Sequence, residues 1–554
     1  MRGYRSTRLG LVAGLTVIAL LAGACGQSSH PAAGTTSTSP ATSKTTGAPV
    51  HHPVVLAGSG APRHGGSIVY GVDSDPNGWN PLTARWTETA LTEANTVFDP
   101  LAAWGTHYDV EPYLAKSFTH SADYRTWTIA LRPGVSYHDG TRFNAASVIT
   151  DLNALRASTL TGASLTPVAS VDAVDDLTVA VRMSIPWSVF PTALTAQAGM
   201  MAAPSQILSG NTSRPVGTGP FVFSSWAPNA TFVVHRNPTY WRHGLPYLDQ
   251  ITFRPILNET TSMSSLTNGD IDMLLTSLSS IQSKLADLAT HHQMQLVYSA
   301  GETEESAIMV NTTAAPLNDL RVRQALAYGT DTRAWARATG TDPATMADGP
   351  FAPGSKWYVP TGYPTYDLAR AKALVAQVQA KSGPITFTLQ CESDPTVDQE
   401  CQILQSQWDR LGMRVAINTV VESTLITNAV TGAYQATIWR QFGEQDPDGD
   451  IQWWDSANTK PPLALNMARN QDPILDAALE VGRTSAKPYE RELAYITVAR
   501  RLAKDLPYIW LNHEIWVVAA RNNVRGLDQT TLPDGTPTDG VTSGVERLGQ
   551  IWLT

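Results

Sequence analysis

The stretch TWTIALRPGVSYHDGT, residues 126–141, predicts a strand and its turn early in the fold. From Trp127 to Leu131, apolar residues alternate with smaller or polar ones, which is the pattern of a strand with one buried face. Arg132-Pro-Gly-Val135 follows with turn-forming residues that end the strand. His138-Asp-Gly140 indicates a second turn, so we expect His138 to belong to the scaffold and not to act as a catalytic base.

Residues 385–419 predict a parallel sheet. Ile385 to Leu389 is strand-like, Ile403 to Leu411 places apolar residues on one helical face, and a further strand begins at Val415. In this order, the helix is the crossover connection between two parallel strands. Mixed strands early in the chain and such units later therefore predict separate α/β lobes.

Cys391 and Cys401 flank the connection between that first strand and the helix. In an exported protein we expect them to form a disulfide that staples the strand to the helix. Two reduced, buried thiols are the alternative.

The composition bounds the class of protein. The chain has 554 residues, 42% of them hydrophobic and 16% charged, with a formal net charge of −9. This length suggests about three domains, and the mildly acidic balance excludes the basic stripe of a nucleic-acid binder. Three cysteines exclude a disulfide-rich scaffold and a multi-cysteine metal cluster. The 16 Trp and 17 Tyr, against 11 Phe, suit the walls of a binding cleft.

The N-terminus has the pattern of an export signal. Three arginines precede an apolar run from Leu9 to Leu21, and small residues lead to Cys25. We expect residues 1–24 to be a lipoprotein signal peptide and the Cys25 thiol to be diacylated. Cleavage after Ala24 without lipidation is the alternative. Residues 25–64, rich in Ser, Thr, Ala, Gly and Pro, predict a flexible tether.

Common enzyme motifs are missing from the sequence. Neither the phosphate-binding G-x-x-x-x-G-K motif nor the G-x-S-x-G nucleophile elbow occurs. Asp446, Asp448 and Asp450 alternate like the start of a calcium loop, but Ile451 replaces the turn glycine and Ala457 the closing Glu. We expect these acids to cap helices or join a polar network. The sequence predicts no catalytic residue, no cofactor and no metal site.

Five segments in a fixed order carry a family resemblance, and a sixth follows them. They resemble the peptide/nickel type (oligopeptide-binding, family 5) of extracytoplasmic solute-binding proteins that serve ABC importers. The segments are Gly78-Trp-Asn-Pro-Leu82, Val110–Phe118, Thr126–Thr141, Pro215–Phe221, Asn311 with Pro316–Leu326, and Trp439 with Asp446-Pro-Asp448.

The resemblance implies a fold of the periplasmic-binding-protein-like type II. Two α/β lobes would surround a cleft, joined by a hinge near residues 302 and 512, with an extra inserted domain. Domain I would collect residues 65–104, 206–302 and 512–554, domain II would be the insertion 105–205, and domain III would be the distal lobe 303–511. Ligand would be trapped when the lobes close.

The resemblance also implies ligand-binding residues. Arg85, Trp86 and Thr87 lie where the family contacts extended peptides, and Arg85 could instead meet a carboxylate or phosphate. The family's acidic partner of the peptide ammonium group is displaced here, so Glu444 is its candidate substitute. A buried Glu444 needs a cation, either from the ligand or from Arg440.

Four further residues complete the candidate ligand site: Asn311, Trp439, Asp446 and Trp510. Trp86, Trp439 and Trp510 could stack on a sugar or an aromatic group, and core packing is the alternative for each.

The function implied is that of a monomeric receptor, anchored by lipid to the outer face of the cytoplasmic membrane. It would capture peptides and deliver them to the permease and ATPase subunits of an importer, without nucleic acid. The same fold in a non-transporting envelope regulator is one alternative. A nickel complex, haem or an oligosaccharide as cargo is another, and an exported hydrolase is the third.

Overall fold

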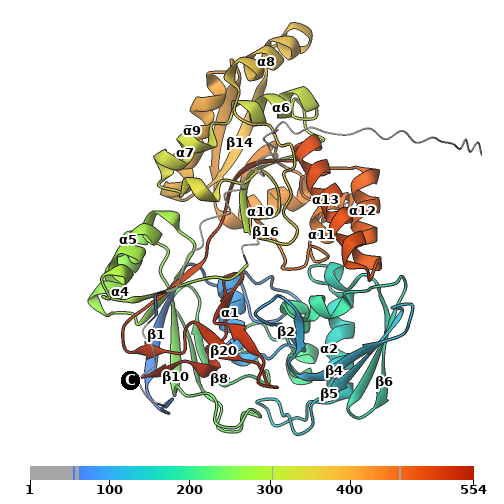
Figure 1. Ribbon diagram of the computed structural model, residues 1–554, viewed down its shortest axis with the longest axis vertical. Helices are drawn as coiled ribbons and strands as arrows, with labels where there is room; N and C mark the ends of the chain where they lie inside the picture. The colour runs from blue at the N-terminus through green and yellow to red at the C-terminus, as the bar shows by residue number, and fades with distance from the viewer. Residues whose placement is uncertain (1–53, 56–60, 302–303, 461–462) are drawn as a thin grey trace, which may run out of the picture. The chain divides into compact units, whose positions relative to one another are not determined.

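A computed structural model describes residues 54–55, 61–301, 304–460 and 463–554 (Figure 1). The predicted signal peptide 1–24 and the lipidation site Cys25 lie outside the described residues. None of the described helices combines the length and apolar composition needed to cross a membrane.

A seven-stranded sheet has the strand order β12-β18-β11-β1-β10-β9-β8. Strand β1 runs parallel to β10 and β11, and the other neighbours are antiparallel. Helix α1 packs on one face, and α4 and α5 pack on the other (Figure 1). The bounds are β1 Ser67–Val72, α1 Glu88–Val97, β8 Phe221–Ala227, β9 Thr231–Arg236, β10 Gln250–Pro255, α4 Glu259–Asn268, β11 Met273–Thr276, α5 Ser279–Thr290, β12 Gln295–Tyr298 and β18 Val517–Ala520.

A five-stranded sheet has the order β15-β14-β16-β13-β17. Strand β14 is parallel to β15 and to β16, as the strand–helix–strand pattern predicted. One hydrophobic cluster joins the sheet to α6, α8 and α9, and a second joins it to α10, α12 and α13. The bounds are β13 Glu304–Val310, α6 Leu320–Gly329, α8 Leu368–Ser382, β14 Thr386–Glu392, α9 Pro395–Asp409, β15 Arg414–Val420, α10 Glu422–Thr431, β16 Ala436–Phe442, α12 Pro473–Thr484, α13 Pro488–Asp505 and β17 Tyr508–His513.

The segment 126–141 forms part of a four-stranded antiparallel sheet, β4-β5-β7-β6. Its strand, β5, spans Thr126–Leu131, and Gly140 has a φ of +84° in the turn that follows. The backbone N–H of His138 donates to the Gly217 carbonyl at 2.8 Å, so His138 has the predicted scaffold role. The other bounds are β4 Ala115–His120, α2 Ala145–Ala157, β6 Val168–Asp175 and β7 Thr178–Met183.

The remaining elements are short. The strands are β2 Ala102–Trp104, β3 Val110–Pro112, β19 Val524–Arg525, β20 Gln529–Thr531, β21 Pro537–Asp539, β22 Val541–Thr542, β23 Val545–Glu546 and β24 Trp552–Leu553. The helices are α3 Pro204–Ser209, α7 Thr332–Thr339 and α11 Ile451–Trp454.

The chain passes twice between the two larger sheets, from β12 to β13 and from β17 to β18. The division into domains I, II and III remains a proposal. Within it, the strands of the seven- and four-stranded sheets fall in the segments assigned to domains I and II. The strands of the five-stranded sheet fall in domain III, except that β17 extends two residues past the boundary at residue 511, to His513.

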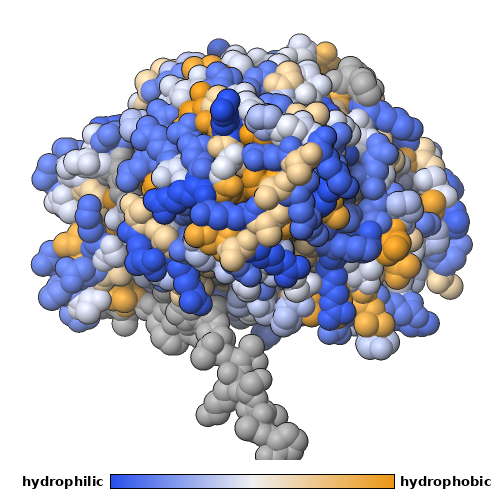
Figure 2. Space-filling model, turned by 90° about the horizontal axis from the view of Figure 1, so that it is seen from above, coloured by the Kyte–Doolittle hydropathy of each residue, from blue (hydrophilic) through white to orange (hydrophobic). Residues whose placement is uncertain are grey.

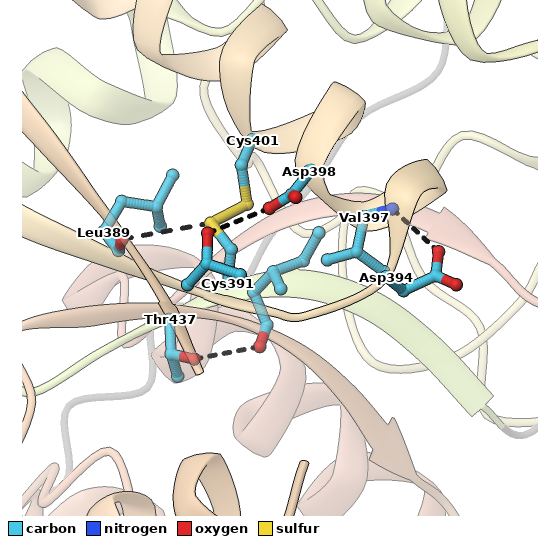
Figure 3. The surroundings of a disulfide bond; sticks show 9 residues. Leu389, Cys391, Asp394, Val397, Asp398, Cys401 and Thr437 are labelled. Atoms are coloured by element: carbon cyan, nitrogen blue, oxygen red, sulfur yellow. Dashed lines mark hydrogen bonds between the residues drawn. A yellow bond between two sulfur atoms is a disulfide. The ribbon is translucent and has the colours of Figure 1, made fainter. Parts of the chain in front are cut away.

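The predicted disulfide is present. Cys391 at the end of β14 and Cys401 in α9 are bonded, with a Cα–Cα distance of 6.6 Å, and both are fully buried (Figure 3). The carboxylate of Asp394 caps α9 by accepting from the Val397 N–H at 3.2 Å. The bond therefore staples the strand to the helix that follows it.

Part of the predicted tether lies against the folded body. Val54 pairs with Leu296 of β12 through two backbone hydrogen bonds of 2.8 and 2.9 Å. Val55 packs against the core of the seven-stranded sheet. The expectation of a free tether over all of residues 25–64 is therefore wrong at this point, because Val54 satisfies backbone groups at the sheet edge.

Hydrophilic residues cover most of the face seen from above, and apolar residues form small groups on it (Figure 2). Scattered apolar side chains of this kind are ordinary on a solvent-exposed surface.

Candidate functional site

A cavity of about 340 Å³ is lined by residues from both sides of the two chain crossings. Helix α1 and residues 538–547 contribute from the side of the seven-stranded sheet. Strand β16, helix α10 and the loop 443–445 contribute from the side of the five-stranded sheet. The volume lies at the lower end of the range of small-ligand sites, about 300–1,000 Å³.

The lining combines apolar walls with a few charges, as ligand sites usually do. The larger apolar residues include Trp86, Leu91, Trp104, Trp439, Trp453 and Met467. The charged residues are Arg85, Glu88, Glu422, Glu444, Asp539 and Arg547. Of the predicted site residues, the structure thus brings Arg85, Trp86, Thr87, Trp439 and Glu444 together around one cavity.

Arg85 and Glu444 balance each other's charge in this lining. The Arg85 guanidinium lies 4.4 Å from the ring centre of Trp453 and donates to Gln452 Oε1 at 3.4 Å. Burial lowers the pKa of Arg85 to about 10, although Glu444 acts in the opposite direction. Burial raises the pKa of Glu444 to about 6, which Arg85 opposes. The cation that faces Glu444 is therefore Arg85.

The alternative pairing of Glu444 with Arg440 is wrong. Arg440 Nε lies 2.7 Å from Glu304 Oε1, and its Nη2 donates to Ser277 Oγ at 2.8 Å. Burial lowers the pKa of Arg440, but the carboxylates of Glu304, Glu514 and Asp73 together more than compensate, so the net shift is upward.

Strand geometry explains this difference. In the pairing of β13 with β16, Ser306 lies opposite Arg440, so Glu304 is the diagonal neighbour on the same face of the sheet. Strand β16 ends at Phe442, two residues before Glu444, so the alternation of the strand does not carry Glu444 to that face.

Thr87 and Trp86 combine structural roles with a place in the lining. Thr87 is the N-cap of α1, and its Oγ1 accepts from the Ala90 N–H at 3.4 Å. The indole of Trp86 donates to the Gly78 carbonyl at 3.0 Å and stacks on Phe98 with ring centres 5.6 Å apart. Most of Trp86 is therefore core, and only part of it faces the cavity.

Asn311 and Trp510 lie outside the cavity lining. The side-chain amide of Asn311 donates to the Tyr434 carbonyl at 3.1 Å and accepts from Thr313 Oγ1 at 2.7 Å. Trp510 is fully buried on β17 and stacks on Tyr508 at 5.0 Å. Both side chains stabilise the five-stranded sheet and its connections.

The three alternating acids form a polar network, as predicted. Asp446 pairs with Arg491, and Asp448 Oδ1 accepts from Arg483 Nε at 2.7 Å. Asp450 accepts from the Glu444 N–H at 3.1 Å. Over the described ranges, no group of three or more His, Cys, Asp or Glu side chains is arranged to hold a metal ion. Asp446 lines a smaller neighbouring cavity of about 80 Å³ instead.

Asp448 also connects two separate parts of the fold. Its Oδ2 accepts from the indole N–H of Trp187 at 2.7 Å, and the Arg483 guanidinium lies 4.9 Å from the ring centre of Trp187. Trp187 follows β7 of the four-stranded sheet, whereas Arg483 is in α12. This Trp187–Asp448–Arg483 cluster therefore ties the predicted domain II to the predicted domain III.

The sequence interpretation missed four charged lining residues: Glu88, Glu422, Asp539 and Arg547. A signal for Glu88 was available, because Glu88, Leu91 and Asn95 recur at the spacing of one helical face, next to the predicted Arg85–Thr87. Arg547 carries no local signal, because its place beside Asn95 depends on contacts between distant segments.

The model of the family "Bacterial extracellular solute-binding proteins, family 5 Middle" matches residues 109–462. A glutathione-binding protein, GsiB of Pectobacterium atrosepticum, is 28% identical over 438 residues, which cover 76% of this chain and 83% of the relative.

Solved structures of periplasmic binding proteins share the fold. DppA from Helicobacter pylori, in complex with the peptide STSA, has a TM-score of 0.77 at 22% identity and covers 89% of this chain and 98% of its own. The oligopeptide-binding protein AppA from Bacillus subtilis, in complex with a nonapeptide, has a TM-score of 0.77 at 20% identity. The match covers 89% of this chain and 100% of the AppA chain. The fold is thus the predicted type II α/β architecture.

Proposed function

The chain belongs to the family 5 bacterial extracellular solute-binding proteins, and from this premise we propose that it is the short-peptide receptor of an ABC importer. In this proposal it binds and releases an unchanged solute. Its partners are the permease and ATPase subunits of the importer, and a lipid on Cys25 anchors it outside the cytoplasmic membrane.

The observation that carries this proposal is the cavity lined from both sides of the chain crossings. A ligand held there contacts α1 on one side and β16 on the other, so its binding free energy favours the state in which both walls are in place. Aromatic walls with a few charges suit a peptide, which presents apolar side chains between polar groups.

The size of the cavity favours a short peptide. A volume of about 340 Å³ lies near the lower end of the range of small-ligand sites, about 300–1,000 Å³. The relatives named as glutathione-binding proteins support the same size class, since glutathione is a tripeptide. We therefore propose di- and tripeptides, with glutathione among the first to be tested.

Mass spectrometry of the protein purified under native conditions tests whether a small peptide co-purifies with it. Calorimetric titration of the ligand-free protein with glutathione and with mixed di- and tripeptides then measures affinity. We expect at least one of these peptides to bind with one-to-one stoichiometry. Absence of binding by every peptide would refute the proposal.

A cavity-filling variant sharpens the test. Leu91→Trp places a larger side chain in the lining and should abolish peptide binding. Leu257→Trp is the control, because Leu257 is 70% exposed and outside the lining, and it should leave binding unchanged. Equal binding by both variants would show that peptides bind elsewhere.

A further inference from the structure

One face of α1 lines the cavity, and its length provides a scale for the ligand. Glu88, Leu91 and Asn95 all line the cavity, and their spacing places them on one face of the helix. At a rise of about 1.5 Å per residue, Glu88 and Asn95 are separated by about 10.5 Å along the helix axis.

Glu88 marks the first end of this face. Glu88 is 8% exposed, and its Oε2 has no hydrogen-bond partner among the described residues. A carboxyl group buried without a partner costs free energy unless a ligand supplies the missing interaction. The unsatisfied oxygen, in the lining of a ligand-sized cavity, therefore points to a donor on the ligand.

The charges around Glu88 favour a cationic donor. Burial and the carboxylate of Glu304 raise the pKa of Glu88 well above its usual range, and Glu444 adds to this, whereas Arg440 opposes it. Arg440 is engaged by Glu304, and Arg85 is engaged by Glu444 and Trp453. A ligand ammonium group at this end would stabilise the ionised form of Glu88.

Arg547 marks the other end of the face. Its Nη1 donates to Asn95 Oδ1 at 3.3 Å, and its guanidinium lies 5.0 Å from the ring centre of Tyr113. In the part of the chain that the structure describes, Arg547 forms no ion pair with a carboxylate, although Asp539 also lines the cavity. A guanidinium has five N–H donors in a geometry that matches a carboxylate.

We propose that the cavity recognises a linear zwitterion, with the ligand ammonium group at Glu88 and the ligand carboxylate at Arg547. An extended peptide advances about 3.4 Å per residue, so a span of about 10.5 Å corresponds to about three residues. Between the two ends, Leu91 and Trp439 offer apolar walls to uncharged side chains. This inference rests on the proposed function and names the polarity and length of the peptide.

Blocked peptides test it on the unmodified protein. The probes are Ala-Leu-Ala, its N-acetylated form and its C-terminal amide, each titrated calorimetrically. We expect either modification to weaken binding by about 30-fold or more, because each removes one of the two charge-assisted contacts between the peptide and the cavity.

Two variants assign the two ends. In Glu88→Gln the N-acetylation penalty should fall below about threefold while the amidation penalty persists, and Arg547→Gln should show the reverse. Matched controls are Glu480→Gln, an exposed carboxylate outside the lining, and Arg132→Gln, a guanidinium 5.7 Å from the Trp241 ring and also outside the lining. Both controls should keep both penalties.

The outcomes separate the two proposals. If free and blocked peptides bind equally well, the peptide-receptor function stands and the zwitterion inference is refuted. If the penalties exchange between the two variants, the ligand lies in the opposite direction and the assignment is also refuted. If no free peptide binds, the proposed function fails, and the inference fails with it.

Discussion

Arg483→Met tests the ion pair that joins two parts of the fold. Arg483 and Asp448 are only 6% and 2% exposed at their side chains, so removing the guanidinium leaves a buried carboxylate without its cation. It also removes the Nη2 donor to the Asp448 carbonyl at 3.1 Å and the contact with the Trp187 ring. Breaking a buried pair in this way costs about 3–5 kcal/mol.

The assay is equilibrium unfolding in urea, followed by far-UV circular dichroism and by tryptophan fluorescence. We expect Arg483→Met to lower the free energy of unfolding by about 3–5 kcal/mol. Adding Asp448→Asn should recover part of this loss, because a neutral amide is less costly to bury than an unpaired carboxylate, and its oxygen still accepts from Trp187.

Arg182→Met is the matched control, because Arg182 pairs with Asp172 at side chains 57% and 50% exposed. Exposed ion pairs contribute little, so this variant should unfold almost like the wild type. The reasoning is refuted if Arg483→Met unfolds like Arg182→Met, or if Asp448→Asn recovers nothing.

Three further predictions concern stability. Burial raises the pKa of Asp151 to about 8, so the folded state holds a proton that the unfolded state loses near pH 4. The free energy of unfolding should therefore fall from about pH 5 to about pH 9. In urea titrations, Asp151→Asn should make this fall with pH less steep. Cys391→Ala combined with Cys401→Ala should lower the free energy of unfolding by about 3 kcal/mol, because the disulfide closes a loop with a sequence separation of 10 and so restricts the unfolded chain. An unchanged midpoint of urea unfolding would show that the disulfide does not stabilise the fold. Thr87→Ala should cost about 1 kcal/mol through loss of the α1 N-cap, and Thr87→Ser should restore it in thermal melts.

Local patterns predicted much of the fold. The alternation from Trp127 to Leu131 became β5, and Asp319 caps α6 by accepting from the Arg321 N–H at 2.8 Å. The bond between Cys391 and Cys401 joins residues close in sequence. In each case the interacting residues are near neighbours, so the signal lies within one short segment.

The site was less predictable because it depends on contacts between distant segments. Arg440 was assigned to Glu444 by proximity in sequence, but pairing of β16 with β13 brings it to Glu304. Arg547 reaches Asn95 across 452 residues of chain. No local sequence pattern indicates such a contact. The resemblance to a family also did not predict Glu88 or Arg547, the residues at the two ends of the α1 face.

The strand order of the seven-stranded sheet has a consequence for biogenesis. Strand β18 lies in the interior of this sheet, between β12 and β11, yet about 240 residues of chain separate it from β11. At a synthesis rate of about 5–20 residues per second, the ribosome needs about 12–50 s to deliver that strand after β11. Until then the sheet has an open gap between β12 and β11, so the seven-stranded sheet can be completed only near the end of synthesis.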